Sequence, residues 1–179
     1  MKRALAAFLI GLFALGLQAG LATSIPRELC PDLGLLVVLA VGLHWDDATS
    51  GLLVSSALGF AADLLSAAVF GTHALLRVLV FTITAVVRSQ VDLRGGAMLA
   101  LFAAGVTLLY SLGVLFLSGL TAGSNEGVSW SGLGGMFPHA LINGLFAPLV
   151  YALVSRACDR AEGEANRPGL EIDAHRPSF

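Results

Sequence analysis

Residues 31–47 read PDLGLLVVLAVGLHWDD, and this stretch decides how the chain is arranged. Its apolar run covers residues 33–45 and is bounded by Asp32 on one side and by Asp46 and Asp47 on the other. A helix needs roughly 20 apolar residues to cross a hydrocarbon core of about 30 Å, so the run is short for a membrane span. Whether it crosses matters for the whole chain, because every later loop changes sides if it does not.

The positions of lysine and arginine favour a crossing. Loops that are translocated across a membrane are poor in these residues. With the N-terminus inside and residues 33–45 counted as a span, Arg27 lies outside, Arg77 lies within the membrane, and the other basic residues lie inside: Lys2, Arg3, Arg88, Arg94, Arg156, Arg160, Arg167 and Arg176. A re-entrant segment at residues 33–45 would translocate six of these arginines. We therefore expect six spans with both termini in the cytoplasm.

The composition is that of a membrane protein. The chain is 56% hydrophobic and 12% charged, with a mean hydropathy of +0.85, which leaves too few polar residues for a water-exposed surface and implies lipid as its surroundings. A net charge of -2 provides no basic stripe and argues against nucleic acid as a partner.

These features predict an all-α fold, a polytopic integral membrane protein with a bundle of six transmembrane helices and short loops in residues 1–155. The predicted spans are residues 4–23, 32–46, 49–70, 72–91, 95–121 and 134–155. Residues 156–179 mix charges with two prolines, which is typical of a solvated cytoplasmic tail without fixed structure.

Reactive side chains are scarce in these spans. An intramembrane aspartyl protease needs two acids, and Asp63 is the only acid deep within a predicted span. No glycine-rich phosphate loop occurs, and no metal-site spacing relates the histidines, which are His44, His73, His139 and His175. We therefore predict no catalytic, cofactor-binding or metal site, and a protein that is not an enzyme.

The third and fourth predicted spans contain the ionisable residues that are costly in a membrane. Asp63 lies eight residues before Gly71 and Arg77 lies six residues after it, so a tight hairpin at about 1.5 Å per residue places both at nearly the same depth. Three interpretations remain open for Asp63, Arg77 and the nearby His73. They are a structural ion pair of Asp63 with Arg77 that fixes two helices, contact with a partner or ligand, and proton or ion coupling. The structural pair is our expectation.

Small residues in the first span predict close helix packing. Ala7, Gly11 and Ala14 share one face, and Gly16 and Gly20 form a Gly-x-x-x-Gly motif. Such faces serve either packing within the chain or association with another helix.

Three short motifs lie in and around the second to fourth spans: Pro31-Asp32-Leu33-Gly34-Leu35-Leu36, then Gly59 with Asp63-Leu64-Leu65-Ser66, then Phe70-Gly71-Thr72-His73-Ala74-Leu75. With these motifs and its six-span layout, the chain resembles the MreD family of bacterial rod shape-determining proteins. The matching motif positions besides the hairpin charges are Pro31, Asp32, Gly59, Leu64, Ser66, Phe70 and Gly71. The chain departs from the family pattern at Ala61, Ala62 and Ala67, where glycine is common, and in a longer charged tail.

The resemblance implies a non-enzymatic scaffold subunit of the cell elongation complex in the bacterial cytoplasmic membrane. Proteins of this family bind the bitopic protein MreC and work with the MreB filament. Through that assembly they support the glycosyltransferase RodA and its penicillin-binding transpeptidase in lateral peptidoglycan synthesis, and so regulate cell shape. No cofactor is implied.

The size and layout are also similar to those of the substrate-binding membrane subunit of an energy-coupling-factor vitamin transporter. Such a subunit needs polar residues that converge on a cavity between helices. The candidates for that role are few: Trp130, Ser131, His139 and Asn143. A lipid-modifying transferase is a third hypothesis, against which the single deep acid argues.

Overall fold

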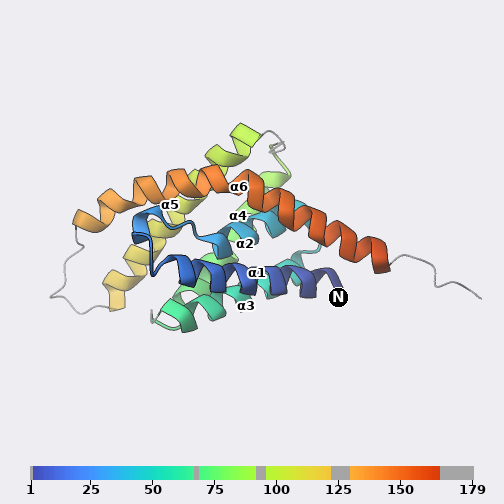
Figure 1. Ribbon diagram of the computed structural model, residues 1–179, viewed down its shortest axis with the longest axis horizontal. Coiled ribbons are helices and arrows are strands. Elements are labelled where there is room, and N and C mark those ends of the chain that lie inside the picture. The colour runs from blue at the N-terminus through green and yellow to red at the C-terminus, as the bar shows by residue number, and fades with distance from the viewer. Residues whose placement is uncertain (1, 67–68, 92–95, 122–129, 166–179) are drawn as a thin grey trace, which may run out of the picture.

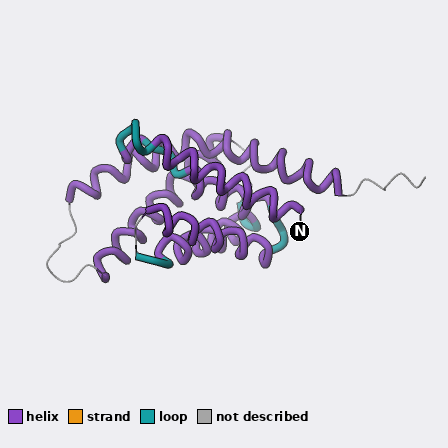
Figure 2. Tube along the Cα trace, turned by 60° about the horizontal axis from the view of Figure 1, so that its bottom comes forward, coloured by secondary structure: helices purple, strands orange, loops and turns teal. Residues whose placement is uncertain are grey.

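The computed structural model describes residues 2–66, 69–91, 96–121 and 130–165. All regular structure in these residues is helical: α1 (Lys2–Leu21), a short 3-10 helix η1 (Arg27–Leu29), α2 (Leu33–His44), α3 (Ala48–Ser66), α4 (Thr72–Arg88), α5 (Gly96–Thr121) and α6 (Trp130–Ala165). Figure 1 and Figure 2 show the helices packed side by side in an elongated bundle, with α6 running along its length. The predicted all-α fold with six helices is confirmed.

The short helix α2 forms the centre of the bundle. A helix that is apolar on every side is stable only when other elements cover it, and every residue of α2 from Leu33 to Leu43 is buried. The other five helices surround it in the order α1, α3, α4, α5, α6; each packs against the next, α6 closes the ring on α1, and all five contact α2. The stretch that decides the topology is therefore also the core.

Four of the helices within the described residues are long and apolar enough to cross a membrane: Lys2–Leu21, Ala48–Ser66, Gly96–Leu120 and Gly134–Gly163. The other two helices are shorter than a hydrocarbon core of about 30 Å. The 12 residues of α2 cover about 18 Å and the 17 residues of α4 about 26 Å. The chain is thus a multi-pass membrane bundle in which α4 completes the ring and α2 fills only part of its length.

The helix α6 differs most from its predicted span. It continues to Ala165, so the prediction of a tail without fixed structure is wrong for residues 156–165. Cys158, in this extension, is fully buried against the bundle, so core packing continues beyond the predicted span. The rest of the predicted tail, residues 166–179, lies outside the described residues.

Ion pairs join this extension to the start of α1 and the end of α2. Arg3 Nη1 lies 2.5 Å from Glu162 Oε1, and the Arg3 guanidinium lies 4.7 Å from the centroid of the Trp45 ring. His44 Nε2 lies 2.9 Å from Asp159 Oδ1. Each exposed pair contributes little by itself, but together they hold three helix ends.

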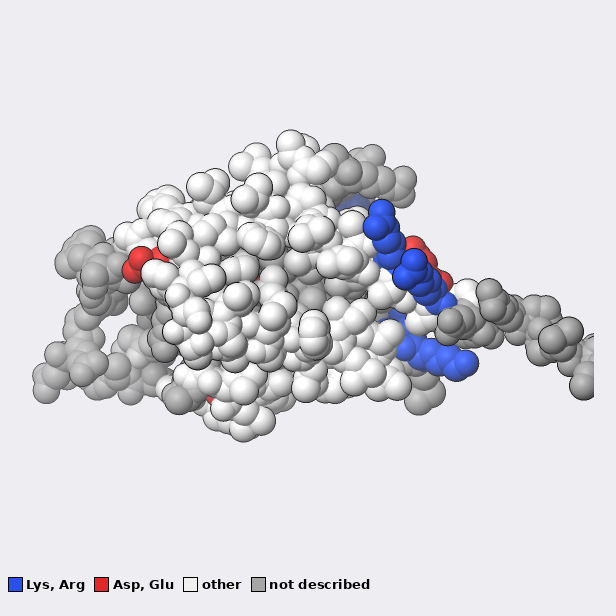
Figure 3. Space-filling model, in the orientation of Figure 1, with Lys and Arg blue, Asp and Glu red and all other residues white. Residues whose placement is uncertain are grey.

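We call this end of the bundle the basic end, because it carries Lys2, Arg3, Arg88, Arg156 and Arg160. Figure 3 shows lysine and arginine gathered there. At the same end Asp47 precedes α3 and accepts hydrogen bonds from the amides of Thr49 (3.1 Å) and Ser50 (3.3 Å). The Ser50 hydroxyl also donates to Asp47, and the hydrogen bonds from Ser50 hold the pKa of this carboxyl below its usual range. The carboxylate thereby caps the first turn of α3.

The two small-residue faces of α1 have different surroundings. Ala7, Gly11 and Ala14 are buried, and a Cβ added at Gly11 would lie 2.4 Å from Leu58 Cδ1 in α3. This face serves packing within the chain. Gly16 and Gly20 lie on the exposed side, where an added Cβ would meet nothing within 4 Å.

The helices α3 and α4 approach each other most closely at Gly59. A Cβ added there would lie 2.3 Å from Ala74 Cα and 2.7 Å from Ala74 N. These are backbone atoms, so they move only if α4 moves. The position therefore requires glycine for packing.

Gly59→Ala should destabilise the bundle by about 1–3 kcal/mol, because the added methyl group overpacks a helix contact. The measurement is the thermal unfolding midpoint of the protein purified in detergent. Gly16→Ala is the matched control, since its methyl group projects into open space and alanine favours the helix. Equal midpoints for the two variants would contradict the close packing at Gly59.

Candidate functional site

The buried charges of the bundle meet at the N-terminus of α2. Asp32 is the N-cap of this helix, and its Oδ1 accepts a hydrogen bond from Leu35 N at 2.9 Å. The same oxygen accepts one from Arg77 Nη2 at 3.2 Å. Both residues are buried, and Arg77 is only 1% exposed. One carboxylate thus caps a helix and neutralises a buried cation.

Arg77 reaches this carboxylate because Gly34 leaves room for it. A Cβ at Gly34 would lie 2.7 Å from Arg77 Nη2 and 2.9 Å from Nη1. Nη1 donates a hydrogen bond to the carbonyl oxygen of Leu58 in α3 at 2.8 Å. A buried charge is costly unless it is both paired and hydrogen-bonded, and Arg77 meets both conditions by joining α2, α3 and α4.

The predicted ion pair of Asp63 with Arg77 is wrong. Asp63 instead accepts hydrogen bonds from three backbone amides at the start of α4: Gly71 N at 2.9 Å, His73 N at 2.8 Å and Ala74 N at 3.3 Å. The first amides of a helix have no partner within the helix and carry partial positive charge, so they stabilise a carboxylate without a cation. Equal depth in the hairpin did not determine the pairing, because Asp32 competes for Arg77.

His73 contacts a residue that the sequence did not indicate. Its Nδ1 lies 2.6 Å from the hydroxyl oxygen of Tyr110 in α5, and the two rings stack with their centroids 5.9 Å apart. Tyr110 is buried within a largely apolar helix. A buried tyrosine hydroxyl needs a hydrogen-bond partner, and this requirement is the signal that could have pointed to it.

Asn143 extends the polar network to α6. Its Oδ1 accepts a hydrogen bond from Asp32 N at 2.8 Å, and its Nδ2 donates to Thr107 Oγ1 at 3.2 Å. His139 Nε2 lies 3.4 Å from the same Nδ2. The transporter hypothesis grouped Asn143 and His139 at a cavity, but Asn143 is fully buried and occupied by these bonds. The side chains of Trp130 and Ser131 lie outside the described residues.

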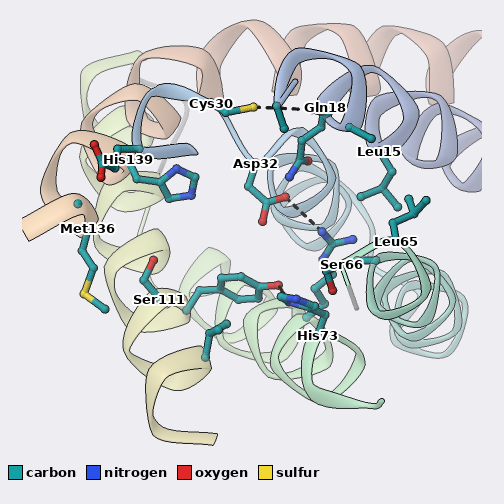
Figure 4. A pocket seen from close by; sticks show the side chains of 18 of the residues that line it. Leu15, Gln18, Cys30, Asp32, Leu65, Ser66, His73, Ser111, Met136 and His139 are labelled. Atoms are coloured by element: carbon teal, nitrogen blue, oxygen red, sulfur yellow. Dashed lines mark hydrogen bonds and ion pairs between the residues drawn. The ribbon is translucent and has the colours of Figure 1, made fainter. Parts of the chain in front are cut away.

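A cavity of about 530 Å³ lies beside this network, at the end of the bundle away from the basic end. We call it the polar cavity; Asp32, Arg77 and His73 line it together with the last turns of α1 and α3 and the first turns of α6. In Figure 4, Ser111, Met136 and His139 approach from one side and Leu15, Leu65 and Ser66 from the other. The space exists because α2 begins only at Leu33, so no central helix fills this part of the ring.

Comparison with protein families matches residues 2–157 to the family described as rod shape-determining protein MreD. The chain belongs to the MreD family. No curated protein and no solved structure matches it. The family match extends over all six helices, well beyond the motif region, and assigns the chain a role in rod shape determination. It confirms the resemblance seen in the motifs and favours it over the likeness to vitamin transporters.

Four motif residues of this MreD-family chain have structural roles. Pro31 accepts a hydrogen bond from Leu33 N at 3.0 Å and positions Asp32 at the start of α2. Gly59 permits the contact of α3 with α4. Gly71 precedes α4 with a φ of 94°, a conformation that glycine adopts readily, and so presents its amide to Asp63.

Three other MreD motif residues are exposed near the α3–α4 turn. Leu64 is 75% exposed and Phe70 67% exposed. The Phe70 ring packs on the Phe60 ring, with 5.4 Å between centroids, and Ser66 lines the polar cavity. Core packing does not explain Leu64 or Phe70, so these side chains face lipid or a partner.

Arg77→Leu should lower the yield of folded MreD-family protein, because the unpaired Asp32 carboxylate costs about 3–5 kcal/mol when its buried partner is removed. Adding Asp32→Asn should restore part of the yield, since asparagine still caps a helix but has no charge. The measurement is monodisperse protein recovered in detergent, with its unfolding midpoint.

The control for this rescue is Asp63→Asn combined with Arg77→Leu. It should restore nothing, because Asp63 binds the amides of α4 rather than Arg77. If Asp63→Asn restored the yield of the Arg77→Leu variant and Asp32→Asn did not, Asp63 would be the partner of Arg77.

Proposed function

We propose that this chain is a non-enzymatic scaffold subunit of the bacterial cell elongation complex that binds the bitopic membrane protein MreC. The family match over residues 2–157 carries the proposal. Through MreC the chain acts with the MreB filament and supports RodA and its penicillin-binding transpeptidase in lateral peptidoglycan synthesis.

The rigidity of the bundle supports a scaffold role. A scaffold has to hold one surface in a fixed arrangement, and Arg77 ties α2, α3 and α4 together through Asp32 and the Leu58 carbonyl group. Because separating a buried ion pair is strongly unfavourable, these helices have one preferred arrangement.

The exposed motif residues support a contact surface at the α3–α4 turn. Leu64 and Phe70 belong to the motifs that resemble the MreD family, yet they do not pack in the core. Helices in lipid associate by close side-chain packing, so an exposed aromatic and a leucine beside a turn suit a partner helix such as that of MreC.

The double variant Leu64→Ala/Phe70→Ala should reduce co-purification of MreC with the full-length chain by several-fold and should cause rod-shaped source cells to round when it replaces the native protein. Its unfolding midpoint should stay near that of the native chain, because both side chains are exposed. Leu53→Ala is the matched control on α3, since Leu53 is 66% exposed but lies nearer the basic end.

Two results would oppose these proposals in different ways. If the Leu53 variant alone lost MreC binding, the contact surface would have to be assigned to the part of α3 near the basic end and not to the α3–α4 turn. Unchanged rod shape on depletion of the chain, together with no MreC in the purified material, would refute the scaffold function.

We also propose that both termini and the basic end face the cytoplasm, which the positions of lysine and arginine support. Alkaline phosphatase fused after Ser24 should be active, because this turn lies away from the basic end. The same enzyme fused after Gln90 should be inactive, and green fluorescent protein at the C-terminus should fluoresce. Activity after Gln90 would contradict the orientation.

A further inference from the structure

The polar cavity combines a buried polar floor with apolar walls. Asp32, Arg77 and the stacked pair of His73 and Tyr110 line its deep part. The walls are largely aliphatic: Leu15, Leu65, Val114, Leu115 and Met136. Its volume of about 530 Å³ lies within the range of about 300–1,000 Å³ that small-molecule sites occupy.

The charges that line the cavity favour a cationic ligand. Glu28, Asp32 and Arg77 are the lining residues with formal charges when both histidines are neutral. Arg77 is paired with Asp32, and the Glu28 carboxylate has no ion-pair partner among the described residues. Within the described side chains, one negative charge of the lining therefore remains unbalanced.

The Asp32 carboxylate also offers the cavity a free acceptor. Asp32 uses Oδ1 for both of its side-chain bonds, so its Oδ2 accepts none from a described residue. Arg77 Nε and His139 Nδ1 are buried and have no hydrogen-bond partner in the described part of the chain. Arg77 has already committed both terminal nitrogens, to Leu58 O and to Asp32. A phosphate or carboxylate would face the Glu28 and Asp32 carboxylates as well as these two unpartnered donors, and the net negative charge of the lining favours a cation instead.

We propose that the polar cavity binds an ammonium group carried on an apolar or aromatic body. The ammonium group donates hydrogen bonds to Glu28 and to Asp32 Oδ2, and the Tyr110 ring contributes cation–π attraction. The apolar body packs on the aliphatic walls. Two sources supply this chemistry, namely a small water-soluble amine and the headgroup of phosphatidylethanolamine.

The test uses the full-length chain in uncharged maltoside detergent and isothermal titration with three probes of similar shape. The probes are 2-phenylethylamine, 2-phenylethanol and 3-phenylpropanoate. The amine should bind at least about tenfold more tightly than the alcohol or the acid, since a charge-assisted hydrogen bond contributes about 1.4 kcal/mol or more. Failure of the amine to bind, or tighter binding of the acid, would overturn the proposal.

Variants then place the binding within the cavity. Glu28→Gln should weaken binding of the amine about tenfold and leave binding of the alcohol unchanged. The reason is that the substitution removes only a charge from an exposed residue. Ser111→Phe should abolish binding by filling the cavity, whereas Leu112→Phe, at a neighbouring position that is 49% exposed, should not. Equal binding by the two phenylalanine variants would exclude the cavity as the site.

Competition separates the two sources. Phosphatidylethanolamine added to the micelles should weaken amine binding if its headgroup occupies the cavity, whereas phosphatidylglycerol should not. Competition by neither lipid assigns the site to a soluble amine. These results are independent of rod shape and of MreC binding, so a chain that fails to bind the amine can still be a scaffold.

Discussion

The structure depends on the ion pair of Asp32 and Arg77 at the N-terminus of α2. This helix starts inside the bundle, where its first residues and Arg77 are buried and their polar groups need partners within the protein. The Asp32 carboxylate satisfies both requirements, because it accepts from Leu35 N and from the guanidinium. Gly34 then becomes necessary, since a side chain there would displace Arg77.

Other features of the bundle follow from this arrangement. Since Arg77 takes Asp32 as its partner, Asp63 is available to cap α4, and the α3–α4 turn needs no cation. Since α2 starts late, five helices enclose it at one end and leave the polar cavity at the other. The backbone amide of Asp32 donates a hydrogen bond to Asn143 Oδ1 and so fixes α6 against α2.

Much of the fold follows from sequence patterns, but the polar contacts do not. Six apolar runs and the distribution of arginine are sufficient for six helices. Asp32 and Asp63 lie at similar depth, and Arg77 pairs with the one that is nearer in space. The packing of α2 between α3 and α4 determines which acid that is. The length of α6 was underestimated for a related reason, because the charges near Asp159 and Glu162 resemble a solvated tail until His44 and Arg3 are placed beside them.

The motif residues that resemble the MreD family fall into two physical groups, and this division relates fold to function. Asp32, Gly59 and Gly71 are constrained by the interior, since each satisfies a cap, a close contact or a turn. Leu64 and Phe70 are exposed, so lipid or a partner must account for them. Asp32 also borders the polar cavity, so the carboxylate that fixes α2 is the one that a ligand there would share with Arg77. A cationic ligand would therefore act on the interaction that holds α2, α3 and α4 together.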